Sequence, residues 1–285
     1  MHRSRLPLAL LAPLPFLLLA ACGDDDATTG PTDVAIQFAA VVGDAPFACG
    51  ETYTGLGITD TTFEPLDFRL YVSSLEVRGA NGAWQPLALD QDTPWQHEGV
   101  ALLDFEDATG RCANGTPDLN DIVTGLAPGA VTGLRFDIGV PFELNHIDAS
   151  TAPSPLNQTA LFWNWLGGYK FIRLEGATDG LPAGWQLHLG STACVAGDGP
   201  GARECANGNR IAVTFPEFDP AADTIVLDVA ALLADADLDQ HTPETPRGCM
   251  AGPQDPDCTP VFEKMGLAHG ASPAGTPSFL RLEQR

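Results

Sequence analysis

The chain has 285 residues, of which 37 are acidic and 14 are lysine or arginine, for a formal net charge of −23. Such a surface repels phosphate backbones, which argues against nucleic acid as a partner. Acidity also keeps exported proteins soluble, so by itself it identifies no ligand.

Residues 1–21 predict a signal peptide of the lipoprotein type. The segment has a basic start, an apolar run and small residues before Cys22, which is the layout of a secretory signal. Its end, Leu19-Ala20-Ala21-Cys22, resembles the lipobox of bacterial lipoproteins, in which the cysteine is lipidated after cleavage. The alternative is an ordinary cleaved signal followed by a chance cysteine.

Residues 22–32 are polar and predict a tether between the anchor and the folded domain. Acyl chains on Cys22 would hold the protein at a membrane without a spanning helix. We therefore expect a membrane-anchored lipoprotein in the bacterial periplasm or on the cell surface.

Residues 33–285 predict a single all-β domain. Apolar and polar residues alternate in many short runs, which is typical of strands that are buried on one face. The candidate strands are residues 34–42, 68–79, 84–89, 99–105, 133–142, 169–174, 184–190 and 210–215. Helical patterns are confined to residues 224–235 and 260–267. We expect a two-sheet antiparallel β-sandwich with long disulfide-pinned loops and one or two short helices.

Six cysteines remain once Cys22 is set aside, and an even number in an exported chain predicts disulfides. The close spacing of Cys194 with Cys205 and of Cys249 with Cys258 favours two local pairs, which leaves Cys49 with Cys112. Other connectivities stay open. No CxxC sequence occurs, which argues against a redox dithiol or a thiolate zinc site. Residues 236–260 are expected to form a surface loop fastened by the last pair.

Short motifs for catalysis are absent from the sequence. It contains no GxSxG, HExxH or CxxCH motif and no glycine-rich phosphate loop after a strand. A hydrolase that uses scattered acids is therefore the weakest hypothesis, and a non-enzymatic protein is favoured.

The segment "LFWNWLGGYKF", residues 161–171, contains five aromatic rings and a lysine. Core packing is one explanation for such a cluster. The other is that Trp163 or Trp165 takes part in chemistry.

Three histidines are candidate metal ligands: His97 at a strand entry, His146 just past a strand end and His188 on the polar face of a strand. A lone histidine is more often a hydrogen-bonded structural residue. Imidazoles without thiolate suit copper, zinc or nickel, and copper binds most tightly in that series. Met250 and Met265 are available as thioether ligands for Cu(I).

These segments together resemble the MbnP-type copper-binding proteins, also called the metallo-mystery pair four-Cys motif family. The matching segments include "FACGETYTGLG", "GVPFELNH", "LFWNWLGGYKF", "LHLGSTAC" and "GCM", in this order along the chain. The resemblance extends from the first predicted strand to the last predicted disulfide.

The resemblance implies an exported protein encoded beside a di-haem, MauG-like cytochrome c peroxidase homologue (MbnH). It implies that this partner oxidises one tryptophan of the WxW motif, here Trp163 or Trp165, to kynurenine. It also implies that Cu(I) or Cu(II) binding depends on the kynurenine together with histidine. His146 and His188 lie in matching motifs and are the expected ligands, with His97 in reserve.

Two points qualify the resemblance. The mature chain has six cysteines where the family pattern has four, so one disulfide is additional. The competing hypothesis is a cell-surface recognition or structural lipoprotein that binds glycan or protein without metal, in which the tryptophans only pack.

Overall fold

The computed structural model describes residues 30–199 and 201–285. The predicted signal peptide, Cys22 and most of the predicted tether lie outside the described residues. In the described part, no helix has the length and apolar character needed to cross a membrane.

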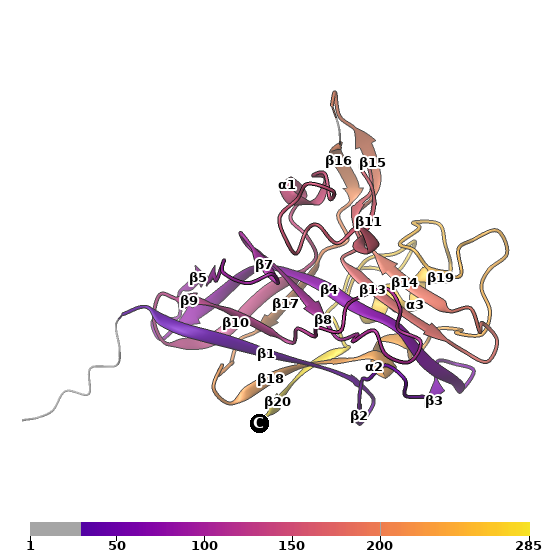
Figure 1. The fold of residues 1–285 in the computed structure, drawn as a ribbon, viewed down its shortest axis with the longest axis horizontal. Helices are drawn as coiled ribbons and strands as arrows, with labels where there is room; N and C mark the ends of the chain where they lie inside the picture. Colours follow the sequence, from indigo (N-terminus) through magenta and orange to yellow (C-terminus); the bar gives the residue numbers. More distant parts are fainter. Residues whose placement is uncertain (1–29, 200) are drawn as a thin grey trace, which may run out of the picture.

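Two β-sheets stack to form the body of the molecule (Figure 1). The smaller sheet has the order β20-β18-β1-β9-β6, and β2 pairs with β1. Its strands are β1 (Thr32–Val42), β2 (Ala45–Pro46), β6 (Ala88–Leu89), β9 (Ile122–Ala127), β18 (Asp223–Asp228) and β20 (Leu280–Gln284).

The larger sheet has the order β17-β10-β4-β13-β14-β19. These strands are β4 (Thr61–Gly79), β10 (Val131–Ile138), β13 (Ile172–Ala177), β14 (Trp185–Leu189), β17 (Ile211–Phe215) and β19 (Gly248–Cys249). Four more strands join it: β3 (Tyr53–Leu56), β5 (Trp84–Pro86), β7 (Gln96–His97) and β8 (Val100–Asp104). The predicted all-β sandwich is confirmed. Two pairings, β1 with β18 and β14 with β19, are parallel rather than antiparallel.

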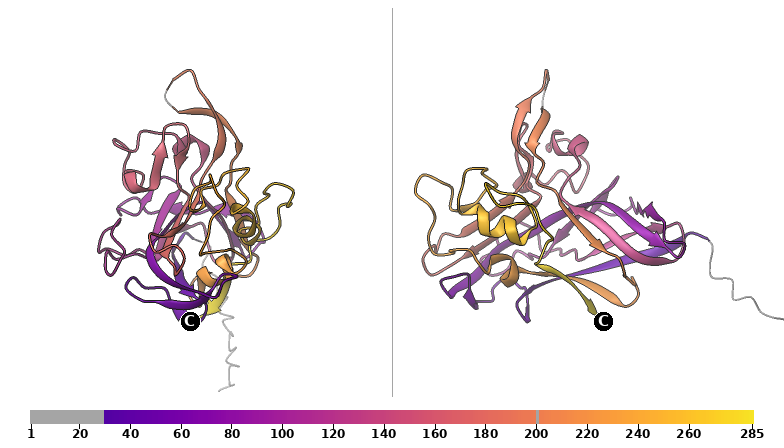
Figure 2. Two further views of the ribbon diagram at one scale, coloured as in Figure 1. Left: turned by 90° about the vertical axis from the view of Figure 1, so that its right-hand side faces the viewer. Right: turned by 180° about the vertical axis from the view of Figure 1, so that it is seen from behind.

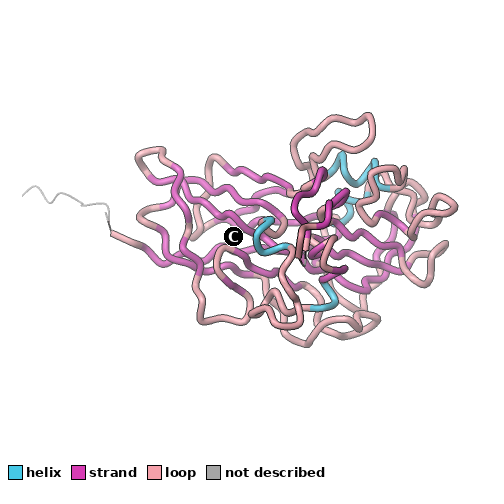
Figure 3. Tube along the Cα trace, turned by 90° about the horizontal axis from the view of Figure 1, so that it is seen from above, coloured by secondary structure: helices cyan, strands magenta, loops and turns pink. Residues whose placement is uncertain are grey.

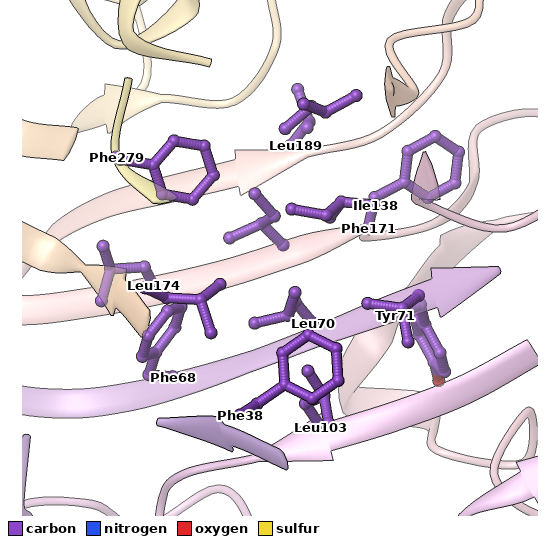
Figure 4. Packing of buried hydrophobic residues seen from close by; sticks show 14 of the residues in the cluster. Phe38, Phe68, Leu70, Tyr71, Leu103, Ile138, Phe171, Leu174, Leu189 and Phe279 are labelled. Atoms are coloured by element: carbon purple, nitrogen blue, oxygen red, sulfur yellow. The ribbon is translucent and has the colours of Figure 1, made fainter. Parts of the chain in front are cut away.

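The core lies between the two sheets because each sheet turns one apolar face inward. In β1 every second residue is buried, including Val34, Ile36 and Phe38, as alternation along a strand requires. Phe38 meets Phe136 of β10 edge to face, with ring centroids 5.8 Å apart. Figure 4 shows Phe38 and Leu70 among the side chains of this core.

Strand β4 is the longest element and pairs with five other strands. Residues 68–73 are all buried, because both faces of β4 are covered there. Phe68 and Leu70 belong to the apolar core. Arg69 and Ser73, at alternate positions, lie on the outer face beneath loops.

A projecting lobe stands on the outer face of the larger sheet (Figures 1 and 2). It contains α1 (Phe142–Asn145), the 3-10 helix η1 (Thr159–Leu161), the hairpin of β11 (Phe162–Asn164) with β12 (Gly168–Tyr169), and the hairpin of β15 (Thr192–Ala196) with β16 (Ala202–Asn207). Strands dominate the remainder and helices are short (Figure 3).

The disulfides are Cys49–Cys112, Cys194–Cys205 and Cys249–Cys258, the pairing that the cysteine spacing favours. The second links opposite residues of the β15–β16 hairpin. The third closes the loop between β19 and α3 (Cys258–Lys264). The predicted helix over residues 224–235 is half wrong, because residues up to Asp228 form β18 and only α2 (Val229–Leu233) is helical.

We expect Phe38→Ala to lower the free energy of unfolding by about 3–5 kcal/mol, because it removes a buried ring and leaves a cavity between the sheets. Ile58→Ala is the control, since Ile58 is 64% exposed and its loss should change stability by less than about 0.5 kcal/mol. Urea denaturation measures both. Equal effects would contradict this assignment of the core.

Candidate metal centre

The outer face of the larger sheet carries ionisable residues in one row. Strand register places Asp104 of β8 opposite Arg69 of β4, Arg69 opposite Arg173 of β13, and Arg173 opposite His188 of β14. Residues opposite one another in neighbouring strands point to the same face of the sheet. All four are buried.

Acidic residues in the adjacent row pair with these cations. Arg69 contacts Asp67 at 2.5 Å, and Arg173 contacts Asp67 at 3.1 Å. Arg173 also contacts Glu175 at 2.7 Å, and Glu175 Oε1 lies 2.6 Å from His188 Nε2. Isolated buried charges are very unfavourable, so this alternation of sign is what permits burial. Residues 67, 69, 173, 175 and 188 come from both of these rows. Together we call them the buried charge row.

The buried charge row alters the pKa values of its members. Burial raises the pKa of Glu175, but hydrogen bonds from His188 and Arg173 outweigh it and lower that pKa to about 2. Burial lowers the pKa of His188 despite its contact with Glu175. The pair is therefore an ionised carboxylate beside a neutral imidazole at neutral pH.

His188 has one ring nitrogen without a hydrogen-bond partner. Its Nε2 lies against Glu175, whereas its Nδ1 is buried and finds no partner among the described residues. Buried polar atoms are nearly always hydrogen-bonded, and leaving one unpaired is costly. An unpaired buried imidazole nitrogen is a free donor atom for a ligand.

Trp163 packs over Gly190, two residues after His188. A Cβ added at Gly190 would lie 2.5 Å from Trp163 Cζ3, so the indole occupies the space that a side chain at position 190 would fill. Residues two apart in a strand face the same side, which puts the indole on the face of the sheet to which His188 belongs.

Met250 reaches this region from β19. The parallel register pairs Leu187 with Cys249, and Met250 is the next residue after this pair. Met250 and Trp163 line one cavity of about 430 Å³, together with Ser191 and Cys194. The sequence showed Met250 only as an available thioether; its position after Cys249 in "GCM" was the signal.

Trp165 has a different environment from Trp163. It is 43% exposed, because Asn164 begins a tight turn after β11: Asn164 Oδ1 accepts hydrogen bonds from the backbone N–H groups of Leu166 and Gly167. The two tryptophans thus differ, one lining the cavity and the other at the surface.

His146 directly follows α1 and lies within the projecting lobe. Its Nδ1 lies 3.3 Å from the Trp165 carbonyl oxygen, and its Nε2 lies 3.2 Å from Asn145 Nδ2 and 3.6 Å from Cys205 Sγ. His146, Cys194 and Cys205 form a compact group. Because the two sulfurs are joined in a disulfide, this group offers one imidazole and no thiolate.

His97 lies apart from these residues. It is on β7, which pairs with β8, and strands β8, β4 and β13 separate β7 from β14. At about 4.8 Å between neighbouring strands, His97 and His188 are on the order of 20 Å apart. Its ion-pair contact is Glu98, 3.8 Å away.

Cation contacts join the buried charge row to the segment that carries Trp163. Arg173 Nη1 and Lys170 Nζ both donate to the carbonyl oxygen of Ala160, at 3.1 and 2.9 Å. Ala160 lies in η1, immediately before β11. These contacts hold the segment that leads into β11 over the outer face of the sheet.

Comparisons with known proteins identify the family of this chain. The family description MbnP matches residues 31–251, a range that includes Trp163, His188 and Met250. The chain belongs to the MbnP family. The solved structure of MbnP from Methylosinus trichosporium is similar, with a TM-score of 0.79 and 33% sequence identity, over 89% of this chain and 99% of that one. A comparison with curated protein sequences found no match.

Burial raises the pKa of Asp104 from 3.8 to about 7. The folded protein therefore keeps a proton that the unfolded chain releases, and this group lowers the free energy of unfolding as pH rises from about 4 to about 7. Asp104→Asn should make that decline smaller in urea denaturation at a series of pH values. The exposed Asp92→Asn is the control and should retain it. An unchanged decline in Asp104→Asn would contradict the assignment.

Proposed function

We propose that this protein is an exported copper-binding protein whose site combines His188, Met250 and a kynurenine formed from Trp163. The observation that carries the proposal is the unpartnered, buried Nδ1 of His188 on the face where Trp163 and Met250 lie. The protein is a metal-binding protein and the substrate of a partner enzyme, and is not itself an enzyme.

The donor set fits copper. Neutral imidazole and thioether are soft or borderline ligands, and a thioether in particular favours Cu(I). Indole is a poor ligand because its nitrogen lone pair belongs to the aromatic ring. Opening the five-membered ring yields an aryl amine and a ketone, both of which can donate an electron pair. Conversion of Trp163 thus turns a packing side chain into a metal-binding one.

Trp163 rather than Trp165 is the proposed site of modification. Trp163 lines the cavity with Met250, so its ring-opened product would meet the other donors. Trp165 is 43% exposed, and its backbone carbonyl oxygen lies 3.3 Å from His146 Nδ1. His146, which the sequence predicts as a ligand together with His188, is a secondary candidate in this proposal.

The proposed partner is a di-haem protein of the MauG or MbnH type, which supplies the oxidising power. Phe142, Trp165 and Leu166 are exposed on the projecting lobe and offer this partner an apolar surface close to Trp163. A lipid anchor on Cys22 would hold both proteins at a membrane of the periplasm or cell surface.

Co-expression with the di-haem protein tests the proposal. Intact-protein mass should show loss of one carbon and gain of one oxygen, and copper should be retained only by the modified protein. Trp163→Phe should abolish both the mass change and the retention of copper. Trp165→Phe should leave the proposed donor residues His188, Met250 and Trp163 in place. Trp84→Phe is the matched control, because Trp84 packs against Arg135 away from the cavity.

Equal copper binding by unmodified protein would contradict the kynurenine component and leave a plain histidine site. Protein that stays unmodified and retains no copper would favour the alternative function, a cell-surface recognition or structural lipoprotein that binds glycan or protein.

Variants of the ligands give a second test. His188→Asn and Met250→Leu should each weaken Cu(I) binding by more than the roughly 10- to 100-fold that is typical of changes behind the ligands. His97→Asn should leave the affinity unchanged, because three strands separate β7 from β14. Competition with a chromophoric Cu(I) chelator measures each affinity. A larger loss for His97→Asn than for His188→Asn would refute this choice of ligand.

A further inference from the structure

We infer that Glu175 is a positioning residue that fixes the tautomer of His188, so that Nδ1 and not Nε2 is the atom offered to a metal beside Trp163 and Met250. This inference rests on the proposed function for its role, but the geometry that carries it is present in the protein without metal.

The first step is the contact between Glu175 and His188. Glu175 Oε1 lies 2.6 Å from His188 Nε2, and both side chains are buried. An ionised carboxylate only accepts hydrogen bonds, so the nitrogen that faces it must carry the proton. In a neutral imidazole, the other nitrogen then holds the lone pair. Nδ1 is therefore the metal-binding nitrogen.

The second step is what holds Glu175 in place. The same Oε1 accepts a hydrogen bond from Arg173 Nε at 2.7 Å, and Arg173 also contacts Asp67. Glu175 thus cannot turn away from His188 without leaving a buried guanidinium short of a partner, which is strongly unfavourable. Carboxylates that orient ligating histidines in this way are widespread at metal sites.

The third step is that one arginine serves both halves of the site. Arg173 holds Glu175 through Nε and the Ala160 carbonyl through Nη1. Ala160 precedes β11, which carries Trp163. Arg173 therefore contacts both the residue that orients the imidazole and the segment that leads to the tryptophan. These contacts restrict the movement of the two side chains relative to each other before any metal binds.

Glu175→Leu is the informative substitution because it removes the acceptor that faces His188 Nε2. Glu175→Gln is the conservative variant. The same Oε1 contacts both Arg173 Nε and His188 Nε2, and Arg173 can only donate, so the amide oxygen would take this position. It would still accept from Nε2 and keep the wild-type tautomer.

The experiment is ¹⁵N NMR of the histidine side chains in metal-free protein, with and without Glu175→Leu. Wild-type His188 should carry its proton on Nε2, and Glu175→Leu should show both tautomers. In protein that contains kynurenine, Cu(I) affinity from chelator competition should fall about 10- to 100-fold in Glu175→Leu. Glu175→Gln, which keeps an oxygen acceptor, should retain the wild-type tautomer and most of the affinity.

Glu106→Leu is the matched control, since Glu106 is also a buried glutamate and its side chain accepts from the backbone of Ala108 instead of contacting His188. It should keep the wild-type tautomer and affinity.

Two results would overturn the inference: a proton on Nδ1 of wild-type His188, or an unchanged Cu(I) affinity in Glu175→Leu despite a changed tautomer. Failure of the proposed function has a different signature. Wild-type protein that shows the expected tautomer but binds no copper would overturn the copper proposal and support the Glu175–His188 arrangement.

Discussion

Arg173 donates to Glu175, contacts Asp67 and reaches the carbonyl of Ala160 in a region that is shielded from water. Charges in such a place must find partners of opposite sign or hydrogen bonds. The outer face of the larger sheet meets this requirement by alternating cations and carboxylates along neighbouring strands. Covering loops contribute backbone carbonyls, including that of Asn114 to Arg69. The loops are therefore held down by polar contacts rather than by apolar packing alone.

This constraint explains where the site lies. The segment that carries the paired tryptophans begins at η1, whose Ala160 carbonyl accepts from both Lys170 and Arg173. From that fixed point, β11 brings Trp163 against Gly190, while the turn at Asn164 sends Trp165 to the surface. Two identical side chains thus acquire different environments. Trp163 is partly buried and packs over Gly190, whereas Trp165 is 43% exposed.

The MbnP family match extends over residues 31–251, whereas the unpartnered nitrogen of His188 marks one part of the molecule. Two of the three disulfides lie near the candidate donors. Cys249–Cys258 fastens the loop that follows β19 and so fixes Met250. Cys194–Cys205 ties together the hairpin against which His146 lies. A loop-rich protein gains most from such covalent links where loops carry function.

The sequence by itself determined the all-β class, the disulfide pairs that it favoured and strands such as β1, β4 and β14, because alternation and short cysteine spacing are local properties. It also placed His188 on the strand face opposite Trp185, since that follows from a period of two. It did not predict β9, β18 or β20 of the smaller sheet. Only the tertiary structure decided that Glu175 meets His188, that Gly190 leaves room for Trp163, that Met250 arrives beside them and that His97 does not. These facts depend on the register between strands and on the path of long loops, and both are fixed by contacts between residues far apart in the chain.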